Sequence, residues 1–265
     1  MTAIAVTIAG SDSGGGAGIQ ADLKTFSALG VYGASVITAL TAQNTLGVQG
    51  IHDVPVDFIA AQIDSVFSDL AVKAVKIGML SQPAVIATVA AGLKRHKAQN
   101  VVLDPVMVAA SGHRLLNPAA ISALTTILIP EVMLITPNLL EAAALLDQPV
   151  ASDEDEMLAQ GRMLIARGAR AVLMKGGHGT GSMSVDLLVL PDTVARLEAP
   201  RIVTNNSHGT GCTLSSAIAA GLAKGLPLGQ AVTEAKDYVT RAIAASDRLA
   251  IGHGHGPTHH FHAWW

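Results

Sequence analysis

The chain has 265 residues, a formal net charge of −3 at pH 7, and hydrophobic side chains at 50% of its positions. This composition excludes an intrinsically disordered chain, and the absence of a strongly basic balance argues against a protein that tracks nucleic-acid phosphates. Cys212 is the only cysteine, which excludes an intrachain disulfide and favours a reducing compartment.

Short apolar, β-branched runs alternate along the chain with longer amphipathic segments. The runs are typical of buried strands and cover 4–9, 35–41, 75–79, 101–106, 133–136 and 171–174. The amphipathic segments are typical of helices and cover 56–70, 83–96, 118–128 and 153–167, followed by two Ala-rich helices at 210–224 and 228–249. This alternation predicts one α/β domain over residues 1–265, with a mainly parallel sheet flanked by helices on both faces.

The sequence does not suggest a membrane protein. Apolar runs such as 84–93 are too short to span a bilayer. Residues 1–4 lack the basic region and apolar run of a secretory signal, so we expect a cytoplasmic protein without a membrane or nucleic-acid partner.

Polar and glycine residues follow each predicted strand. In parallel sheets, ligands bind in the loops at the carboxyl ends of the strands. The residues in these positions are Gly10-Ser11-Asp12, Gln43-Asn44, Gly78-Met79, Asp104-Pro105, Pro137-Asn138 and Lys175-Gly176-Gly177. We therefore expect the functional site at this edge of the sheet.

The first glycine-rich segment, residues 10–22, contains the spacing Gly16-x-Gly18-x-x-Ala21 of a loose dinucleotide fingerprint. The next strand ends without the acidic residue that would bind a ribose hydroxyl. Asp22 is also expected in the opening turn of a helix, where it would repel a diphosphate. These features disfavour a nicotinamide-dependent oxidoreductase. No Gly-Lys-Ser/Thr sequence occurs, which excludes a Walker A loop.

A second glycine-rich segment, residues 207–213, opens the first Ala-rich helix. Its backbone amides and the helix dipole could form an anion hole for a phosphoryl group, or the segment could be a plain helix entry with Thr210 as N-cap. Cys212 could be a small buried residue. In the first helical turn, however, its thiol would be expected to have a lowered pKa and a reactive character.

Lys175 follows a buried strand and precedes two glycines. It could direct a point charge at a transferring phosphate. Equally, it could be a lysine whose ammonium snorkels to solvent at a strand end.

Blocks of residues spread over the whole chain resemble the hydroxymethylpyrimidine/phosphomethylpyrimidine kinases of thiamine biosynthesis, within the ribokinase-like superfamily. The blocks are IAGSD at 8–12, GGGAGIQADLKTF at 14–26, SVITALTAQNT at 35–45, KIGML at 76–80, LDPVMV at 103–108, LITPN at 134–138, MKGGH at 174–178, HGTGC at 208–212 and the tail 257–265. The resemblance implies a ribokinase-like fold and two ATP-dependent transfers, first to the hydroxymethylpyrimidine and then to its monophosphate. It also implies a tendency to form homodimers.

The resemblance further implies which residues act in catalysis. Cys212 matches a residue thought to assist deprotonation of the substrate hydroxymethyl group, and the amides of Gly209, Thr210, Gly211 and Cys212 match an anion hole. Lys175 matches the lysine thought to neutralise the transferring phosphate, which makes it a cofactor-binding residue together with Gly209 and Gly211.

Substrate-binding positions follow in the same way. Asp22 and Gln43 match residues that hold the aminopyrimidine, in keeping with a carboxylate that accepts from an amine and an amide that pairs with a ring nitrogen. Gly10, Met79 and Val106 match the wall of the ring pocket.

Asn138 and Glu141 match an Asn-x-x-Glu pattern associated with Mg²⁺ and its water shell. Three residues depart from the family pattern. Leu140 stands where proline is usual, Ser207 stands where threonine is commoner, and Ala110 stands where lysine is frequent. Loss of that lysine would weaken phosphate capture, and the second transfer in particular.

Three other functions compete with this hypothesis. A pyridoxal kinase of the same superfamily would act on a similar hydroxymethyl-bearing ring, a non-catalytic protein would bind the pyrimidine without ATP turnover, and an oxidoreductase would use a nicotinamide cofactor. The anion-hole motif together with Lys175 favours a kinase.

The sequence also contains a cluster of histidines and a run of acidic residues. Five histidines of the tail invite a metal-site interpretation, but they lack cysteine partners and are expected to pack at the C-terminus or against a subunit; they are His253, His255, His259, His260 and His262. The acidic run 153–156 is expected at a helix start, as the helix dipole favours. Asp186 and Asp192 are expected to be surface loop charges.

Overall fold

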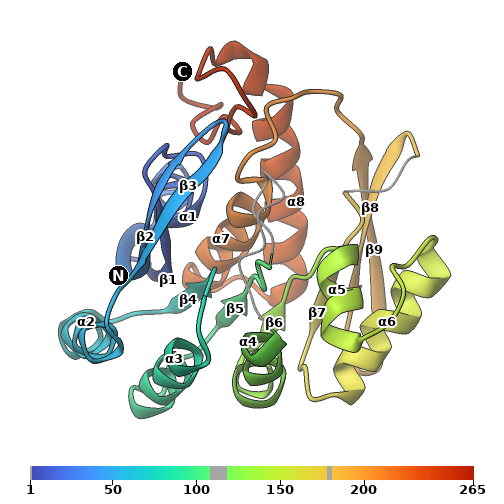
Figure 1. Ribbon diagram of the computed structural model, residues 1–265. Helices are drawn as coiled ribbons and strands as arrows, with labels where there is room; N and C mark the ends of the chain where they lie inside the picture. Colours follow the sequence, from blue (N-terminus) through green and yellow to red (C-terminus); the bar gives the residue numbers. More distant parts are fainter. Residues whose placement is uncertain (1, 108–117, 178–180) are drawn as a thin grey trace.

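The computed structural model describes residues 2–107, 118–177 and 181–265 (Figure 1). In these ranges nine strands form one sheet in the order β3-β2-β1-β4-β5-β6-β7-β8-β9. The strands are β1 (Ile4–Asp12), β2 (Tyr32–Asn44), β3 (Gly47–Asp53), β4 (Ala74–Ile77), β5 (Val101–Leu103), β6 (Leu134–Ile135), β7 (Val172–Lys175), β8 (Met183–Val189) and β9 (Val194–Pro200).

The central strands from β2 to β7 pair in parallel, whereas β3, β8 and β9 pair antiparallel at the two edges. The prediction of a mainly parallel sheet is therefore confirmed. The sequence analysis did not predict the three strands that pair antiparallel. Of these, β3 and β9 are largely exposed and lack a continuous apolar run.

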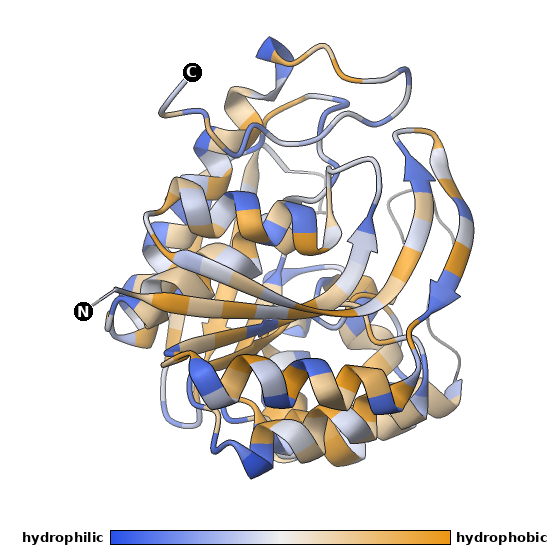
Figure 2. Ribbon diagram, turned by 90° about the vertical axis from the view of Figure 1, so that its left-hand side faces the viewer, coloured by the Kyte–Doolittle hydropathy of each residue, from blue (hydrophilic) through white to orange (hydrophobic). Residues whose placement is uncertain are grey.

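Helices cover both faces of the sheet, as predicted. They are α1 (Gly18–Ala28), α2 (Val56–Asp69), α3 (Pro83–Arg95), α4 (Pro118–Ala123), α5 (Leu139–Leu146), α6 (Glu154–Ala166), α7 (Thr210–Ala223) and α8 (Leu228–Ala244). On one face α2 to α6 pack against alternate strand residues such as Val6 and Ile77, and on the other α1, α7 and α8 pack against Ala5 and Val102. The hydropathy colouring shows the apolar sheet between these two layers (Figure 2). No helix in the described ranges is long and apolar enough to cross a membrane.

Helix ends account for two differences from the sequence analysis. Gly209, not Thr210, is the N-cap of α7, because its φ of 80° places it in the left-handed region that glycine tolerates. The predicted helix 228–249 ends at Ala244 and is followed by the 3₁₀ turn Ser246–Arg248. The acidic run behaves as predicted, since Asp153 caps α6 and accepts a hydrogen bond from the Glu156 amide at 2.8 Å.

The C-terminal segment, residues 256–265, lies against α8 and against His208, which precedes Gly209. His259 and His260 are buried, the His259 amide donates to the carbonyl of Ala242, and the rings of His259 and Trp265 lie 4.6 Å apart. The prediction that these histidines pack at the C-terminus is confirmed for this pair. Among the described residues no group of three His, Cys, Asp or Glu side chains is arranged to hold a metal ion.

Candidate active site

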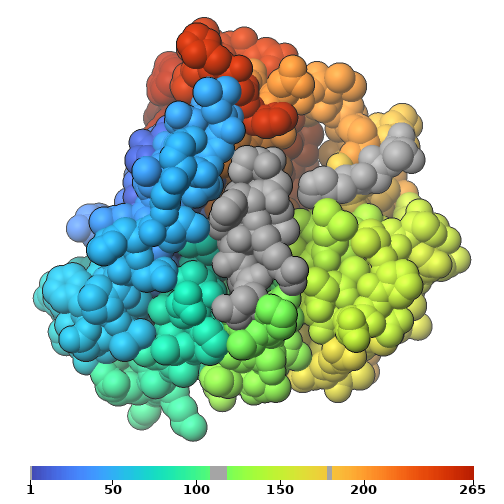
Figure 3. Space-filling view, in the orientation of Figure 1, coloured from blue at the N-terminus to red at the C-terminus, as the bar shows by residue number. Residues whose placement is uncertain are grey.

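A cavity of about 580 Å³ lies at the carboxyl ends of the parallel strands, where the sequence analysis expected the site. Its walls include residues that follow β1, β4, β5 and β7, the N-terminus of α7 and one side of α8. Residues of the β2–β3 hairpin and of α5 also line the cavity. On the face shown in Figure 3, this hairpin (blue) and α5 (yellow-green) lie on opposite sides.

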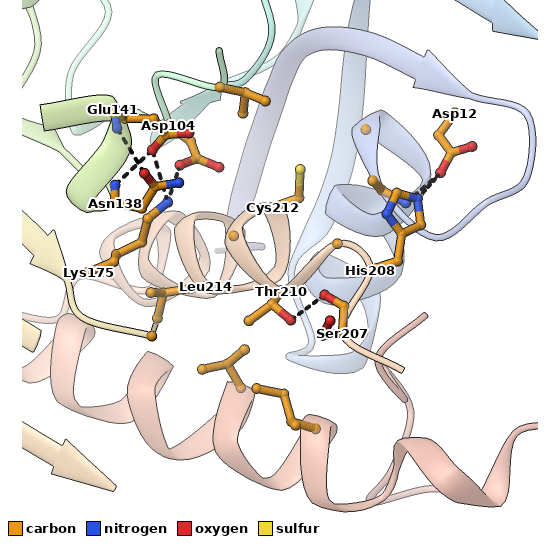
Figure 4. Close-up of a pocket in the computed structure, with 18 of the residues that line it drawn as sticks. Asp12, Asp104, Asn138, Glu141, Lys175, Ser207, His208, Thr210, Cys212 and Leu214 are labelled. Carbon is orange, nitrogen blue, oxygen red and sulfur yellow. Dashed lines mark hydrogen bonds and ion pairs between the residues drawn. The ribbon is translucent and has the colours of Figure 1, made fainter. Parts of the chain in front are cut away.

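Most of the predicted site residues line this cavity. They are Gly10, Gln43, Met79, Val106, Asn138, Glu141, Lys175, Gly209, Thr210, Gly211 and Cys212. In Figure 4, Cys212 lies at the start of α7, between a cluster around Lys175 and the pair of Asp12 with His208. Ala110 lies outside the described residues, as does His178 of the MKGGH block.

The N-terminus of α7 is built by close backbone packing. A side chain at Gly209 would clash with the carbonyl oxygen of Gly16, so only glycine fits there. The Thr210 hydroxyl donates to the Ser207 carbonyl at 2.7 Å, which ties the loop to the helix start. Since the first amides of a helix have no intrahelical acceptor, the cavity receives a local positive field suited to an anion.

The environment of Cys212 corrects one expectation. Burial raises the pKa of the thiol to about 11, although the positive charge of Lys76 acts in the opposite direction. The expected lowering of this pKa is therefore wrong, because desolvation outweighs the position in the first helical turn. Near neutral pH the group is a thiol.

Lys175 forms the centre of a buried charge cluster. Its Nζ lies 2.8 Å from Asp104 Oδ1 and 3.8 Å from Glu141 Oε2, and its side chain is 13% exposed. Burial alone would lower the pKa of Lys175, but Asp104 and Glu141 outweigh that effect and hold the pKa above its ordinary value. The Lys175 side chain is therefore a fixed cation at the cavity wall and does not reach out to solvent.

The sequence analysis placed Asp104 after a predicted strand but did not predict that it pairs with Lys175. Thr136 Oγ1 donates to the same carboxylate at 3.0 Å, and Lys175 and Lys76 outweigh burial to hold its pKa below the ordinary value. The signal that could have found it is its position directly after β5, beside a proline that stops the strand.

Asn138 and Glu141 form a capping box at the start of α5. The Glu141 amide donates to Asn138 Oδ1 at 2.9 Å, and the Asn138 amide donates to Glu141 Oε2 at 2.8 Å. Burial raises the pKa of Glu141 to about 7. The Asn138 amide oxygen is thus engaged in the cap, and the Glu141 carboxylate is the group of this pair that faces Lys175.

Glu141→Gln should change the pH dependence of stability, since glutamine can keep the capping box without a titratable group. A carboxyl whose pKa rises from 4.5 to about 7 on folding contributes stability below pH 4.5, and that stability is lost as the pH rises through 7. The variant should therefore gain up to about 3 kcal/mol relative to the wild type between pH 4.5 and pH 8. Urea unfolding at both pH values measures this gain. The exposed Glu131→Gln serves as control, and an equal difference at both pH values would contradict the assignment.

Asp12 and His208 form a second buried pair, which the sequence analysis did not identify. Asp12 Oδ2 lies 2.9 Å from His208 Nε2 and also accepts from the amides of Gly16 and Ala17 at 3.1 and 2.8 Å. Gln43 Nε2 lies 3.4 Å from the same histidine nitrogen. One carboxylate thus joins the first glycine-rich loop to the residue that precedes Gly209.

The structure does not bring Asp22 to the cavity wall. Its side chain is fully buried, in the second turn of α1 rather than the opening turn, and it forms an ion pair with Lys76 at 2.9 Å. Thr7 and Ser216 donate to its two oxygens at 2.6 and 2.7 Å. The carboxylate that was expected to hold the ring is therefore engaged beneath the cavity, as the counter-ion of Lys76.

Comparison with known proteins shows the family of the chain. The model of the phosphomethylpyrimidine kinase family matches residues 12–259. A hydroxymethylpyrimidine/phosphomethylpyrimidine kinase of Rhizobium meliloti is 61% identical over 265 residues, which is 100% of this chain and 99% of the relative.

Solved structures show the same fold. An ADP complex of Bacillus subtilis pyridoxal kinase superposes with a TM-score of 0.91 at 38% identity and covers 98% of each chain. A phosphomethylpyrimidine kinase from Clostridium difficile superposes with a TM-score of 0.80 at 45% identity, over 91% of this chain and 99% of the other. With this agreement in sequence and fold, the chain belongs to the phosphomethylpyrimidine kinase family.

Proposed function

We propose that this kinase transfers the γ-phosphoryl group of ATP to the hydroxymethyl group of 4-amino-5-hydroxymethyl-2-methylpyrimidine and then phosphorylates the monophosphate to the diphosphate, for thiamine biosynthesis. The observation that carries the proposal is that one cavity contains both a buried lysine and the open N-terminus of α7, with Cys212 in its first turn. A phosphoryl group in transfer needs positive charge and positioning more than covalent help.

Each of these residues would act on a different part of the reaction. The amides at the start of α7 and the ammonium of Lys175 would stabilise negative charge on the transferring phosphoryl oxygens. Cys212 would accept the hydroxymethyl proton, a role in which its pKa of about 11 makes it a strong base that is rarely ionised. Gly10, Gln43, Met79 and Val106 would hold the ring.

Glu141 is the residue best suited to Mg²⁺ bound with ATP. A single carboxylate together with phosphates is a common ligand set for this ion, which supplies charge neutralisation when it is bound. Asn138 would contribute through water, because its amide oxygen is engaged in the cap of α5. The raised pKa of Glu141 shows that burial disfavours its charged form, which a bound cation would stabilise.

Phosphorus NMR of the protein with Mg-ATP and the hydroxymethylpyrimidine tests this function. The expected result is monophosphate followed by diphosphate. Monophosphate alone would remove the second transfer, in which case Ala110→Lys should restore it. A lack of product with the pyrimidine, with phosphorylation of pyridoxal instead, would move the protein to the pyridoxal kinases. Pyridoxal is the relevant competitor because a pyridoxal kinase shares this fold.

We also propose that the chain forms a cytoplasmic homodimer through the hairpin of β2 and β3. The edge strand β3 is largely exposed, and Leu40, Leu46 and Ile51 expose 46%, 67% and 41% of their surface. Exposed apolar side chains on an edge strand favour association with another chain. Sedimentation velocity should show a dimer for the wild type and a monomer for Leu40→Glu. A monomeric wild type would refute the proposal.

A further inference from the structure

A buried ion pair in the cavity wall has no part in the roles described so far. Lys236 Nζ, on α8, lies 2.7 Å from Asp186 Oδ2, on β8, and the two side chains are 9% and 5% exposed. Both residues line the cavity. This burial corrects the expectation that Asp186 is a surface loop charge: it is a charged group whose partner lies 50 residues further along the chain.

The second carboxylate oxygen of Asp186 faces the backbone beside Lys175. Asp186 Oδ1 accepts a hydrogen bond from the Gly176 amide at 2.9 Å, and Asp186 is the direct cross-strand partner of Lys175 in the antiparallel pair of β7 and β8. Any side chain at Gly176 would clash with the Val185 carbonyl oxygen, so the two strands approach closely at this point. A buried amide in such a place needs an acceptor, and Asp186 supplies it.

Lys175 is therefore fixed at two points. Its ammonium is bound by Asp104 at 2.8 Å, and the peptide that joins it to Gly176 is held by Asp186. We propose that Asp186 is a positioning residue, neutralised by Lys236, which holds the Lys175–Gly176 peptide so that the Lys175 ammonium projects at the transferring phosphate. This inference rests on the proposed function of Lys175.

Through Asp186, the ion pair also connects the Lys175–Gly176 peptide to helix α8, which lines the cavity. Val239 and Thr240 of α8 line the cavity close in sequence to Lys236. The helix that forms this wall thus also neutralises the carboxylate that holds the lysine turn. An ion pair serving only stability would not need the Gly176 contact, and a well-packed apolar pair could replace it.

Two double variants separate the hydrogen bond from the charge. Asp186→Asn with Lys236→Met keeps an oxygen acceptor for the Gly176 amide and leaves no unpaired buried charge. Asp186→Leu with Lys236→Met removes the acceptor, and leucine is close to asparagine in shape. The two proteins therefore differ mainly in the acceptor. Asp192→Asn, at an exposed position, serves as surface control.

The measurements are kcat and KM for the hydroxymethylpyrimidine, together with hydrogen exchange of the Gly176 amide by NMR. We expect the leucine variant to have a kcat about 10- to 100-fold below that of the asparagine variant, with KM values within twofold, because small displacements of a catalytic group lower turnover steeply. The Gly176 amide should exchange faster in the leucine variant only.

Equal kcat values in the two double variants would overturn the inference, as would a difference confined to KM. Both outcomes leave the proposed function intact as long as the wild type phosphorylates the pyrimidine. If the wild type does not, the proposed function fails by itself. The same comparison is then made with pyridoxal as acceptor, and unequal Gly176 exchange with equal kcat again refutes the positioning role.

Discussion

Lys175→Met is expected to lower kcat by about 10²- to 10³-fold, the usual effect of removing one group that stabilises transition-state charge. The ammonium is fixed by Asp104 and lies at the cavity wall on a largely buried side chain, where its charge is only partly screened by solvent. The KM for the pyrimidine should change less than threefold, because the residues proposed to hold the ring are other residues of the cavity wall. Steady-state kinetics at saturating ATP measures both parameters.

The methionine variant also leaves Asp104 and Glu141 without their shared cation, which costs stability of about 3–5 kcal/mol. Turnover must therefore be divided by the folded fraction, measured by circular dichroism under the assay conditions. Lys94→Met, at an exposed position on α3, is the matched control. A change confined to KM for the pyrimidine would assign Lys175 to the ring pocket instead.

Cys212→Ala is expected to lower kcat by about 10²- to 10⁴-fold, the range for loss of a general base, while the Kd of the pyrimidine changes less than threefold. Because the pKa of the thiol is about 11, the ionised fraction increases about tenfold with each pH unit below that value. The kcat of the wild type should therefore rise with pH from 7 to 9, and that of the alanine variant should not.

The single cysteine allows an independent check of the same assignment. Alkylation by iodoacetamide reports on Cys212 alone, and its rate should increase with pH in parallel with kcat and fall when the pyrimidine is bound. Unchanged turnover in Cys212→Ala would show that another group, or solvent, takes the proton.

The sequence was sufficient to predict the central strands and the edge of the sheet where the cavity lies. Buried parallel strands are continuous apolar runs; Lys175 is the last residue of β7, and Asn138 lies shortly after β6 at the start of α5. The partners of these residues could not be predicted, since Asp104 and Lys175 are 71 positions apart and meet only through the order of the strands. For the same reason Asp186 looked like a loop charge until β8 was seen beside β7.

The pKa of Cys212 shows a second limit of sequence reasoning. A thiol in the first turn of a helix predicts a lowered pKa, but the sign depends on how much protein surrounds the sulfur. Asp22 differs for a related reason: its burial against Lys76 depends on strand β4 and helix α7, which lie far from it in the sequence. Solvation is a property of the whole fold, and local spacing does not encode it.

The segment that precedes α7, residues 207–209, is held by residues from both ends of the chain. The His208 amide donates to the Gly256 carbonyl, the Thr258 amide donates to the His208 carbonyl, and His208 in turn binds Asp12. Residues 12, 208 and 256–258 must therefore all be present before this segment has its full set of contacts. During synthesis on the ribosome, the contact of Asp12 with His208 forms only after nearly the whole chain has emerged, so a nascent chain that ends before residue 256 lacks the contacts that hold His208 beside Gly209.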